Sequence, residues 1–204
     1  MRKPASSANA EPTSNSKDAK RREIVAAATE CFARYGVTRT RIEDAASAAG
    51  ISPTNFYNYY PSRAALIDAV ALDRAAVVVA RVAPAIAEAP SLSEALVDGV
   101  AQTVAACRAD DVFMQLLRLA RHERLGELGM TSTAFGHEFL VRLWGPAIVK
   151  ARQRGDLRDH LDGEEGIIAW MGAVLVMFLL NERVSAKEIR RITALYVAPA
   201  IAEF

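Results

Sequence analysis

The stretch from Thr40 to Arg63 reads TRIEDAASAAGISPTNFYNYYPSR, and it decides how the chain is organised. Two short helical patterns lie in it, separated by Gly50. Thr40 and Glu43 have the spacing of a capping box. In this motif the hydroxyl of the capping residue accepts the N–H of the third helical residue, and the carboxylate of that third residue accepts the N–H of the capping residue. The pattern therefore predicts that the first of these two helices begins at Thr40. Small apolar residues follow at helical spacing: Ile42, Ala45, Ala46 and Ala49.

The second pattern predicts another helix directly after the glycine. Gly50 is suited to end the first helix because glycine adopts the left-handed conformation without strain. Ser52 is a good capping residue. Pro53 fits the first helical position, where the backbone N–H that proline lacks would have no hydrogen-bond partner within the helix. We expect a helix over residues 53–59 with Phe56 packed inward. Two helices joined by a tight glycine turn form a helix-turn-helix.

At these residues the chain resembles the TetR family of bacterial repressors. The resemblance covers roughly residues 20–70 and consists of a Thr cap, an Ala-Gly-apolar-Ser turn and an aromatic end to the second helix. Three departures from the family pattern are Ala45 for Ile or Leu, Tyr60 for Phe and Arg63 for Lys, the last of which keeps the positive charge. The matching residues are Thr40, Ile42, Asp44, Ala45, Ala46, Ala49-Gly50-Ile51-Ser52, Phe56-Tyr57-Asn58-Tyr59-Tyr60 and Ser62-Arg63.

The second helix carries side chains suited to reading DNA. Asn pairs with adenine through two hydrogen bonds, and Thr contacts a thymine methyl group, so Thr54, Asn55 and Asn58 suit base edges. The resemblance implies that Tyr57, Tyr60 and Arg63 contact phosphates. It implies the same for Thr40 and Arg41 at the end of the preceding helix, whereas exposed polar residues on most helices have no such role. The predicted DNA-binding set is Thr40, Arg41, Ser52, Thr54, Asn55, Tyr57, Asn58, Tyr60 and Arg63.

The whole chain has the composition of an all-α protein. Of its 204 residues 51% are hydrophobic, enough for a sizeable core, and helical spacing of apolar residues prevails throughout. We expect about nine helices: a three-helix helix-turn-helix domain and a larger C-terminal helical bundle. The predicted divisions are a disordered tail over 1–17, the DNA-binding domain over 18–63 and a ligand-binding and dimerisation domain over 64–204.

Helix boundaries are predicted from caps and from breakers. The first helix is expected from Asp18 to Tyr35, and a long helix from Arg63 to about Arg81 is expected to end before Pro84. Hydroxyl-bearing and acidic residues at helix starts predict the remaining beginnings at Ser91, Asp110, Thr131, Asp162 and Ser185.

Charge divides unevenly between the two parts. Residues 1–63 carry ten Lys and Arg against six Asp and Glu, and residues 64–204 carry 15 against 18. A basic amino-terminal part suits phosphate binding. Cys31 and Cys107 lie on apolar helix faces and are expected to be buried and reduced. Three scattered histidines give no metal-ligand spacing, no catalytic motif is present, and so no metal, no cofactor and no enzyme activity are expected.

The C-terminal bundle is the expected ligand site. Its middle helices bring large side chains that either line a pocket for a mostly apolar effector or form an ordinary core. Arg118, Arg121 and His122 hold a polar end of that ligand or face solvent. The proposed ligand-binding set is Phe113, Met114, Leu117, Arg121, Phe139, Trp144, Trp170 and Val174.

The last two helices are expected to form a homodimer. They are unusually apolar, and the resemblance implies that two such helices from each subunit pack as four; the alternative is an internal core. The apolar run Ile167 to Leu180 is too short to span a membrane, and no signal-peptide pattern is present, so a cytoplasmic protein without membrane contact is predicted.

These observations predict a ligand-responsive transcriptional repressor that binds a palindromic DNA operator as a homodimer and is released by a small effector. Two alternatives stay open. One is a DNA-binding regulator without an effector, and the other is a helical enzyme or carrier that retains a DNA-binding-like head. The sequence identifies neither the effector, the operator nor the regulated genes, nor whether the protein represses or activates.

Overall fold

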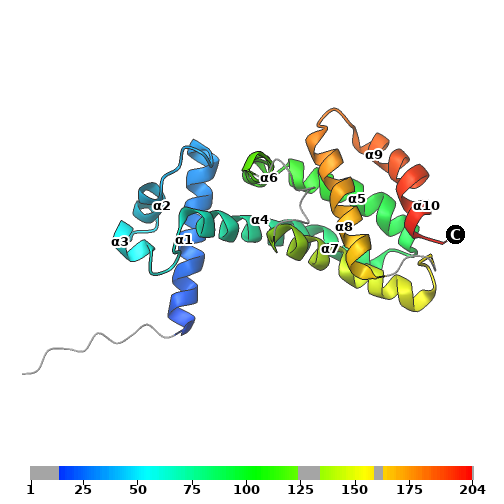
Figure 1. The fold of residues 1–204 in the computed structure, drawn as a ribbon, viewed down its shortest axis with the longest axis horizontal. Coiled ribbons are helices and arrows are strands. Elements are labelled where there is room, and N and C mark those ends of the chain that lie inside the picture. Colours follow the sequence, from blue (N-terminus) through cyan, green and yellow to red (C-terminus); the bar gives the residue numbers. More distant parts are fainter. Residues whose placement is uncertain (1–13, 124–133, 159–162, 204) are drawn as a thin grey trace, which may run out of the picture. The chain divides into compact units, whose positions relative to one another are not determined.

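The computed structural model describes residues 14–123, 134–158 and 163–203 (Figure 1). Within those ranges the chain is helical and holds no strand, apart from one isolated bridge between Leu157 and Ala202. The predicted all-α class is confirmed. The helices are α1 (Ser14–Tyr35), α2 (Ile42–Ala48), α3 (Pro53–Phe56), α4 (Arg63–Glu88), α5 (Leu92–Arg108), α6 (Asp111–Glu123), α7 (Ala134–Arg154), α8 (Glu164–Leu180), α9 (Ala186–Ile192), the π-helical η2 (Thr193–Val197) and α10 (Ala198–Ile201).

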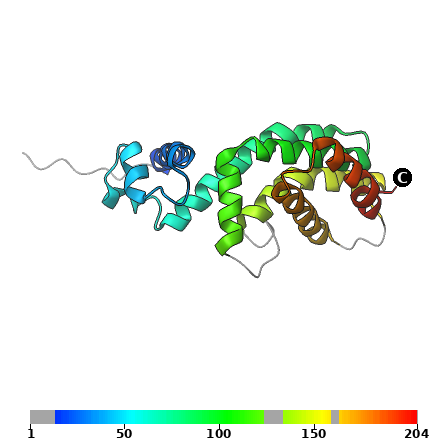
Figure 2. The same ribbon diagram turned by 90° about the horizontal axis from the view of Figure 1, so that it is seen from above.

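The chain divides into two compact units after Leu66, inside the first turn of α4. The first unit, called the head here, contains α1, α2 and α3. Helix α2 packs between the other two, and Figure 2 shows α1 nearly end-on with α2 and α3 to one side of it. All three helices contribute to a core without exposed surface, which fixes the helix-turn-helix. Its buried residues include Ile24, Ala28, Phe32, Ala45, Ala46 and Phe56.

Three predicted boundaries in the head are wrong. Helix α1 begins at Ser14, four residues before the expected start at Asp18. Helix α2 is capped at Arg41 rather than at Thr40, because the Asp44 carboxylate, not that of Glu43, accepts the Arg41 N–H at 2.8 Å. Helix α3 ends at Phe56, not at residue 59, and the next residues form a turn tightened by i to i+3 bonds.

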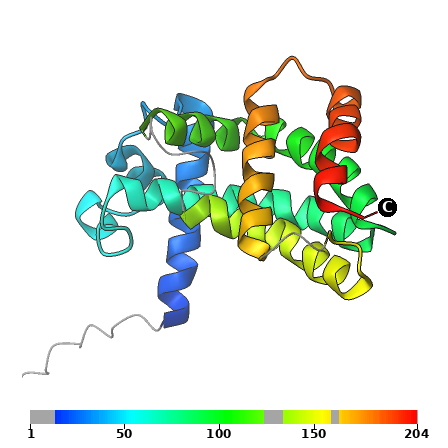
Figure 3. The same ribbon diagram turned by 45° about the vertical axis from the view of Figure 1, so that its right-hand side comes forward.

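The second unit, called the body here, is built around α5. This helix packs against α6, α7 and α8 and against the continuous run of α9, η2 and α10, which is called the last helix here. Most residues of α5 are buried. Figure 3 shows α8 and the last helix running in opposite directions beside it. Gly99 of α5 lets the helices approach closely: a Cβ there would lie 2.7 Å from Ile86 Cγ1 and 2.8 Å from Trp144 Cη2.

Serine caps set the starts of two body helices as predicted. The Ser91 and Ser185 hydroxyls accept N–H bonds from Glu94 and Glu188, each at 3.2 Å. The Asp110 carboxylate likewise accepts the Phe113 N–H at 2.9 Å at the start of α6. The cap expected at Asp162 and the helix start expected at Thr131 lie outside the described residues.

Helix α4 is longer than predicted, since it continues through Pro84 to Glu88. A proline inside a helix removes one backbone hydrogen bond, because proline has no N–H to donate. Here Pro84 is exposed, while Val82 and Ile86 beside it are 2% exposed and extend the buried stripe of the helix. The free energy gained by burying Val82 and Ile86 outweighs the cost of the hydrogen bond lost at Pro84.

The turn between α8 and α9 is held by the last residue of α5. The Arg108 guanidinium donates to the carbonyls of Phe178, Asn181 and Val184 at 2.8, 2.9 and 2.9 Å. The carboxyl end of a helix carries partial negative charge, which a guanidinium offsets. After this turn α9, η2 and α10 run on without interruption, so the last helix contains one π-helical segment.

Two further expectations concern the two cysteine thiols and the possibility of a membrane-spanning helix. Cys31 and Cys107 are free and buried, as predicted, and burial raises the pKa of both thiols. Among the described helices none is both long and apolar enough to cross a membrane.

Candidate nucleic-acid interface

The recognition segment, defined here as residues 52–60, is anchored by one aromatic side chain. Phe56 has no exposed surface, and its ring lies 5.8 Å from that of Tyr57, edge to face, and 5.9 Å from that of Tyr60. At the start of the segment the Ser52 hydroxyl accepts the Asn55 N–H at 3.2 Å, as the predicted cap requires. The anchor and the cap fix the backbone from both ends.

The predicted base-reading side chains point away from that core. Thr54, Asn55 and Asn58 are exposed, and Tyr57 is 50% exposed. Asn58 Nδ2 donates to Asn55 Oδ1 at 3.0 Å, so the two amides are already joined. The segment therefore presents hydroxyl and amide groups on a backbone that is held in place, which suits the major groove of a duplex.

Two of the predicted phosphate contacts remain accessible. Arg41 is exposed and Tyr57 is 50% exposed, and the capping residue Ser52 is exposed as well. Tyr60 is half-buried, its hydroxyl donates to the Arg21 carbonyl at 3.3 Å, and burial raises the pKa of the phenol. A protonated Tyr60 at neutral pH remains a hydrogen-bond donor or acceptor rather than an anion that would repel DNA.

Thr40 and Arg63 are engaged inside the head instead. Thr40 is 3% exposed, and its hydroxyl donates to the Gly36 carbonyl at 2.9 Å and lies 3.3 Å from the Cys31 carbonyl. This burial argues against a phosphate contact by the Thr40 hydroxyl. The Arg63 guanidinium donates to the carbonyls of Thr40, at 3.4 Å, and Val37. Arg63 thus ties the start of α4 to the loop before α2.

Lys20 has a role that the sequence did not reveal. Its ammonium group donates to the Ala49 carbonyl at the end of α2, at 3.1 Å, and to the Glu23 carboxylate at 2.8 Å. A cation at the carboxyl end of a helix is favourable. Only the spatial approach of α1 to that end, 29 residues away, makes the contact, so no local pattern could have identified it.

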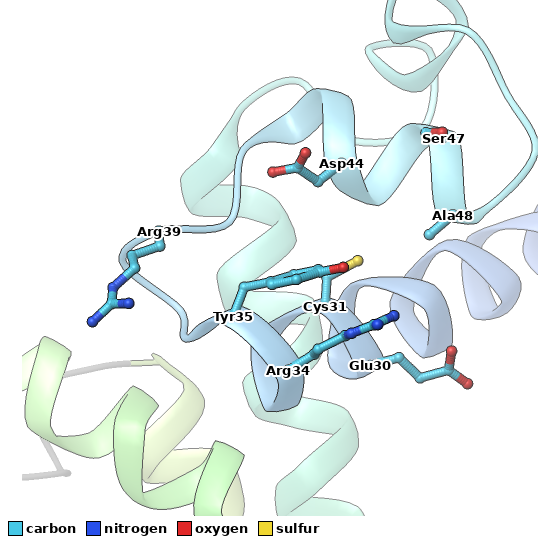
Figure 4. Close-up of a pocket in the computed structure, with 8 residues that line it drawn as sticks. All are labelled: Glu30, Cys31, Arg34, Tyr35, Arg39, Asp44, Ser47 and Ala48. Atoms are coloured by element: carbon cyan, nitrogen blue, oxygen red, sulfur yellow. The ribbon is translucent and has the colours of Figure 1, made fainter.

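The head also has an open hollow of about 680 Å³ between α1 and α2. Figure 4 shows the Tyr35 ring lying across it, and the Arg34 guanidinium carbon is 5.4 Å from the centre of that ring. Two acids and two bases line the hollow, so its charge favours neither anions nor cations. The lining residues are Glu30, Cys31, Arg34, Tyr35, Arg39, Asp44, Ser47 and Ala48.

In the body, most of the predicted ligand-binding residues lie in one core. The Phe113 and Phe139 rings are 5.8 Å apart, and Trp144 has no exposed surface. The Trp144 indole Nε1 is buried and has no hydrogen-bond partner among the described residues. The residues of the predicted set that the structure brings into this core are Phe113, Met114, Leu117, Phe139, Trp144 and Val174.

Two members of the predicted set are placed differently. Trp170 is 39% exposed, whereas the next residue of α8, Met171, is fully buried. Arg121 falls in α6, but its side chain lies outside the described residues. The exposed position of Trp170 argues against a role in an internal pocket.

Comparison with known proteins bears on the head first. Residues 24–70 match the family of bacterial regulatory proteins called tetR. RutR of Escherichia coli strain K12, an HTH-type transcriptional regulator, is 44% identical over 52 residues, which is 26% of this chain and 24% of RutR. The head of the chain is thus a TetR-family domain. The aligned stretch spans about a quarter of the length of the curated relatives it matches.

Solved structures extend the likeness of the fold to nearly the whole chain. RolR in complex with resorcinol superposes with a TM-score of 0.67 at 17% identity, covering 91% of this chain and 93% of RolR. The repressor AlkX from Dietzia sp. strain DQ12-45-1b gives a TM-score of 0.63 at 16% identity, covering 88% and 93%. At such identities the likeness concerns the fold. The relatives are regulators rather than enzymes.

Proposed function

We propose that this chain is a transcriptional repressor that binds a palindromic operator as a homodimer and leaves it when a small, mostly apolar effector binds. The observation that carries the proposal is the recognition segment. Its exposed hydroxyl and amide groups stand on a backbone fixed by the buried Phe56 and the Ser52 cap. Exposed polar groups on a rigid helical turn are what direct reading of bases requires.

In the proposed complex the contacts divide into two kinds. Thr54 and the joined amides of Asn55 and Asn58 meet base edges, and so supply specificity. Phosphate contacts come from Tyr57, Arg41, Ser52 and Tyr60, and they supply affinity that weakens as salt rises. Arg63 uses part of its guanidinium on two carbonyls, and its remaining N–H groups are available to a phosphate.

The dimer contact is proposed on α8 and the last helix. Exposed residues recur along α8 at helical spacing, and two of them are large: Trp170 at 39% and Met177 at 52% exposure. On η2, Leu195 and Tyr196 are 53% and 68% exposed. Apolar surface of this kind suits burial against a second copy. We therefore assign Trp170 to the dimer surface rather than to the effector site.

Two copies are also required by the reading of DNA. One short helix contacts few base pairs, and two copies on half-sites one helical turn apart multiply the specificity. A two-fold dimer thus corresponds to a palindromic operator.

The effector site is proposed within the body core around Phe113, Phe139 and Trp144. The Trp144 indole N–H is a buried donor without a partner among the described residues, and a buried donor gains stability when it bonds an acceptor atom. The effector class that fits is a mostly apolar molecule with at least one hydrogen-bond acceptor. Resorcinol, the ligand in the RolR structure, has this chemistry and is a first probe.

Release of DNA follows from a shift of populations. Effector binding favours one arrangement of α4, the helix that begins in the head and continues in the body. A 100-fold loss of operator affinity requires a differential affinity of about 2.7 kcal/mol between the two states.

DNase I protection on the DNA upstream of the chain's own gene tests the proposal. We expect two protected half-sites related by a two-fold axis and separated by about one helical turn. A panel of small phenols, beginning with resorcinol, is then added to find compounds that remove the protection. Protection that no compound reverses would favour a regulator without an effector. A single unpaired half-site would contradict the homodimer.

A further inference from the structure

Asn55 and Asn58 are linked by two hydrogen bonds before any DNA is present. Besides the bond between the side-chain amides at 3.0 Å, the Asn58 backbone N–H donates to the Asn55 carbonyl at 3.1 Å. Asn55 is itself held, because its N–H donates to the Ser52 hydroxyl and Phe56 follows it in the core. An exposed asparagine ordinarily rotates about two side-chain torsions. Here the Asn55 oxygen restrains the amide of Asn58.

The restraint leaves the reading atoms of Asn58 available. A carboxamide nitrogen carries two hydrogens, so donation of one to Asn55 leaves the second N–H and the carbonyl oxygen of Asn58. These are a donor and an acceptor side by side. Adenine offers the complement in the major groove, with N7 as acceptor and the N6 amino group as donor.

We propose that Asn58 reads an adenine in each half-site through N6 and N7, and that Asn55 is the residue that positions the Asn58 amide for this contact. The inference rests on the proposed DNA-binding function and extends it to a base and to a division of roles. Guanine fits less well, since its N7 and O6 are both acceptors and would place O6 against the Asn58 oxygen.

The proposed contact does not depend on which end of each amide is the oxygen. If both amides were turned over, Asn55 would donate to the Asn58 oxygen, whose second lone pair would still accept, and the Asn58 amino group would keep both hydrogens. In either arrangement one asparagine orients the other, and Asn58 keeps both a donor and an acceptor.

The first experiment identifies the base. The full-length protein selects binding sites from a pool of random DNA duplexes, and each adenine of the enriched half-site is replaced in turn by 7-deazaadenine, which lacks N7, or by purine, which lacks the N6 amino group. At one adenine both replacements are expected to weaken binding by the wild-type protein, each by roughly 5- to 150-fold, the range for loss of a specific base contact. At that adenine the Asn58→Ala protein should not distinguish the natural base from either analogue.

The second experiment assigns the positioning role. Affinities of Asn55→Ala, Asn58→Ala and the double variant for the enriched duplex form a double-mutant cycle. We expect Asn55→Ala to weaken binding in the wild-type background and to have no further effect in Asn58→Ala. Circular dichroism and binding to a scrambled duplex should be unchanged in all three, which a merely structural defect of the head would alter.

The outcomes separate the two levels of the account. If the wild-type protein enriches no site, the proposed function fails. If it enriches a site in which no adenine responds to either analogue, or if Asn58→Ala still distinguishes the analogues, the adenine contact is overturned while DNA binding stands. Additive effects of the two substitutions would overturn the positioning role of Asn55 alone.

Discussion

Replacing Gly99 by Ala tests how closely the body helices are packed. The added Cβ would lie 2.7 Å from Ile86 Cγ1 and 2.8 Å from Trp144 Cη2, both inside van der Waals contact. Both neighbours belong to the packed interior, because Ile86 is 2% exposed and Trp144 has no exposed surface. Overpacking of this kind costs about 1–3 kcal/mol. Against it stands a gain of about 1 kcal/mol in helix propensity when Ala replaces Gly.

Gly166→Ala is the matched control. Gly166 is also in a helix, and a Cβ there would meet nothing within 4 Å. It receives the propensity gain without the clash, so the packing cost appears as the difference between the two variants. We expect Gly99→Ala to be less stable than Gly166→Ala by about 1–3 kcal/mol, or roughly 2–12 °C in Tm for a chain of this size.

Thermal and urea unfolding of both variants at one protein concentration measure the difference, because the Tm of a dimer depends on concentration. Sedimentation at the same concentration shows whether either variant has changed its assembly. If Gly99→Ala is as stable as Gly166→Ala with unchanged assembly, the close approach of α4, α5 and α7 at Gly99 is refuted.

Three further substitutions or reactions test other contacts. Arg108→Met keeps the length of the side chain but loses three bonds to the α8–α9 turn, and urea unfolding should show a loss of about 1–3 kcal/mol; a change below 0.5 kcal/mol would contradict the contact. Thr40→Val should cost about 1–2 kcal/mol by the same measurement, whereas Thr38→Val, on the exposed surface, should stay within about 0.5 kcal/mol; equal effects would refute the buried hydroxyl bond. Iodoacetamide should label native Cys31 and Cys107 slowly at pH 8, because burial raises both thiol pKa values and the thiolate is the reactive form; rapid labelling of native Cys107 would contradict its burial.

Local chemistry explains what could be predicted from the sequence. Ser52, Ser91 and Ser185 cap helices through bonds to amides three residues away, so the pattern that predicts each cap contains both partners. Gly50 has a φ of 67°, as the predicted turn requires. The inward position of Phe56 could also be predicted from the sequence, because it follows from helical spacing.

Contacts between distant residues could not be predicted in this way. The partners of Arg63 precede it by 23 and 26 residues, and the partner of Lys20 at the end of α2 follows by 29. Family resemblance led to Arg63 being expected at a phosphate, whereas the folded head first uses it on carbonyls. The burial of the Thr40 hydroxyl could not be predicted for the same reason, since its acceptors belong to α1 and the following turn.

The exposure of Trp170 could not be predicted for a different reason. Helix α8 is apolar on nearly every side, and a helix without a polar face gives no periodicity that tells its inner from its outer residues. Trp170 and Met171 are therefore equivalent in sequence, yet one is 39% exposed and the other fully buried. Only the packing of α8 against α5 and α7 decides between them.

The most direct test of the central claim is a titration of the purified protein onto the duplex upstream of its own gene and onto a scrambled duplex, at two salt concentrations. Tyr57→Ala is compared with Tyr35→Ala, since both tyrosines are 50% exposed on the head and only Tyr57 lies in the recognition segment. We predict tight, salt-sensitive binding to the native duplex alone, retained by Tyr35→Ala and weakened in Tyr57→Ala. Equal binding of both duplexes by the wild-type protein, or equal loss in the two variants, would contradict recognition of DNA through residues 52–60.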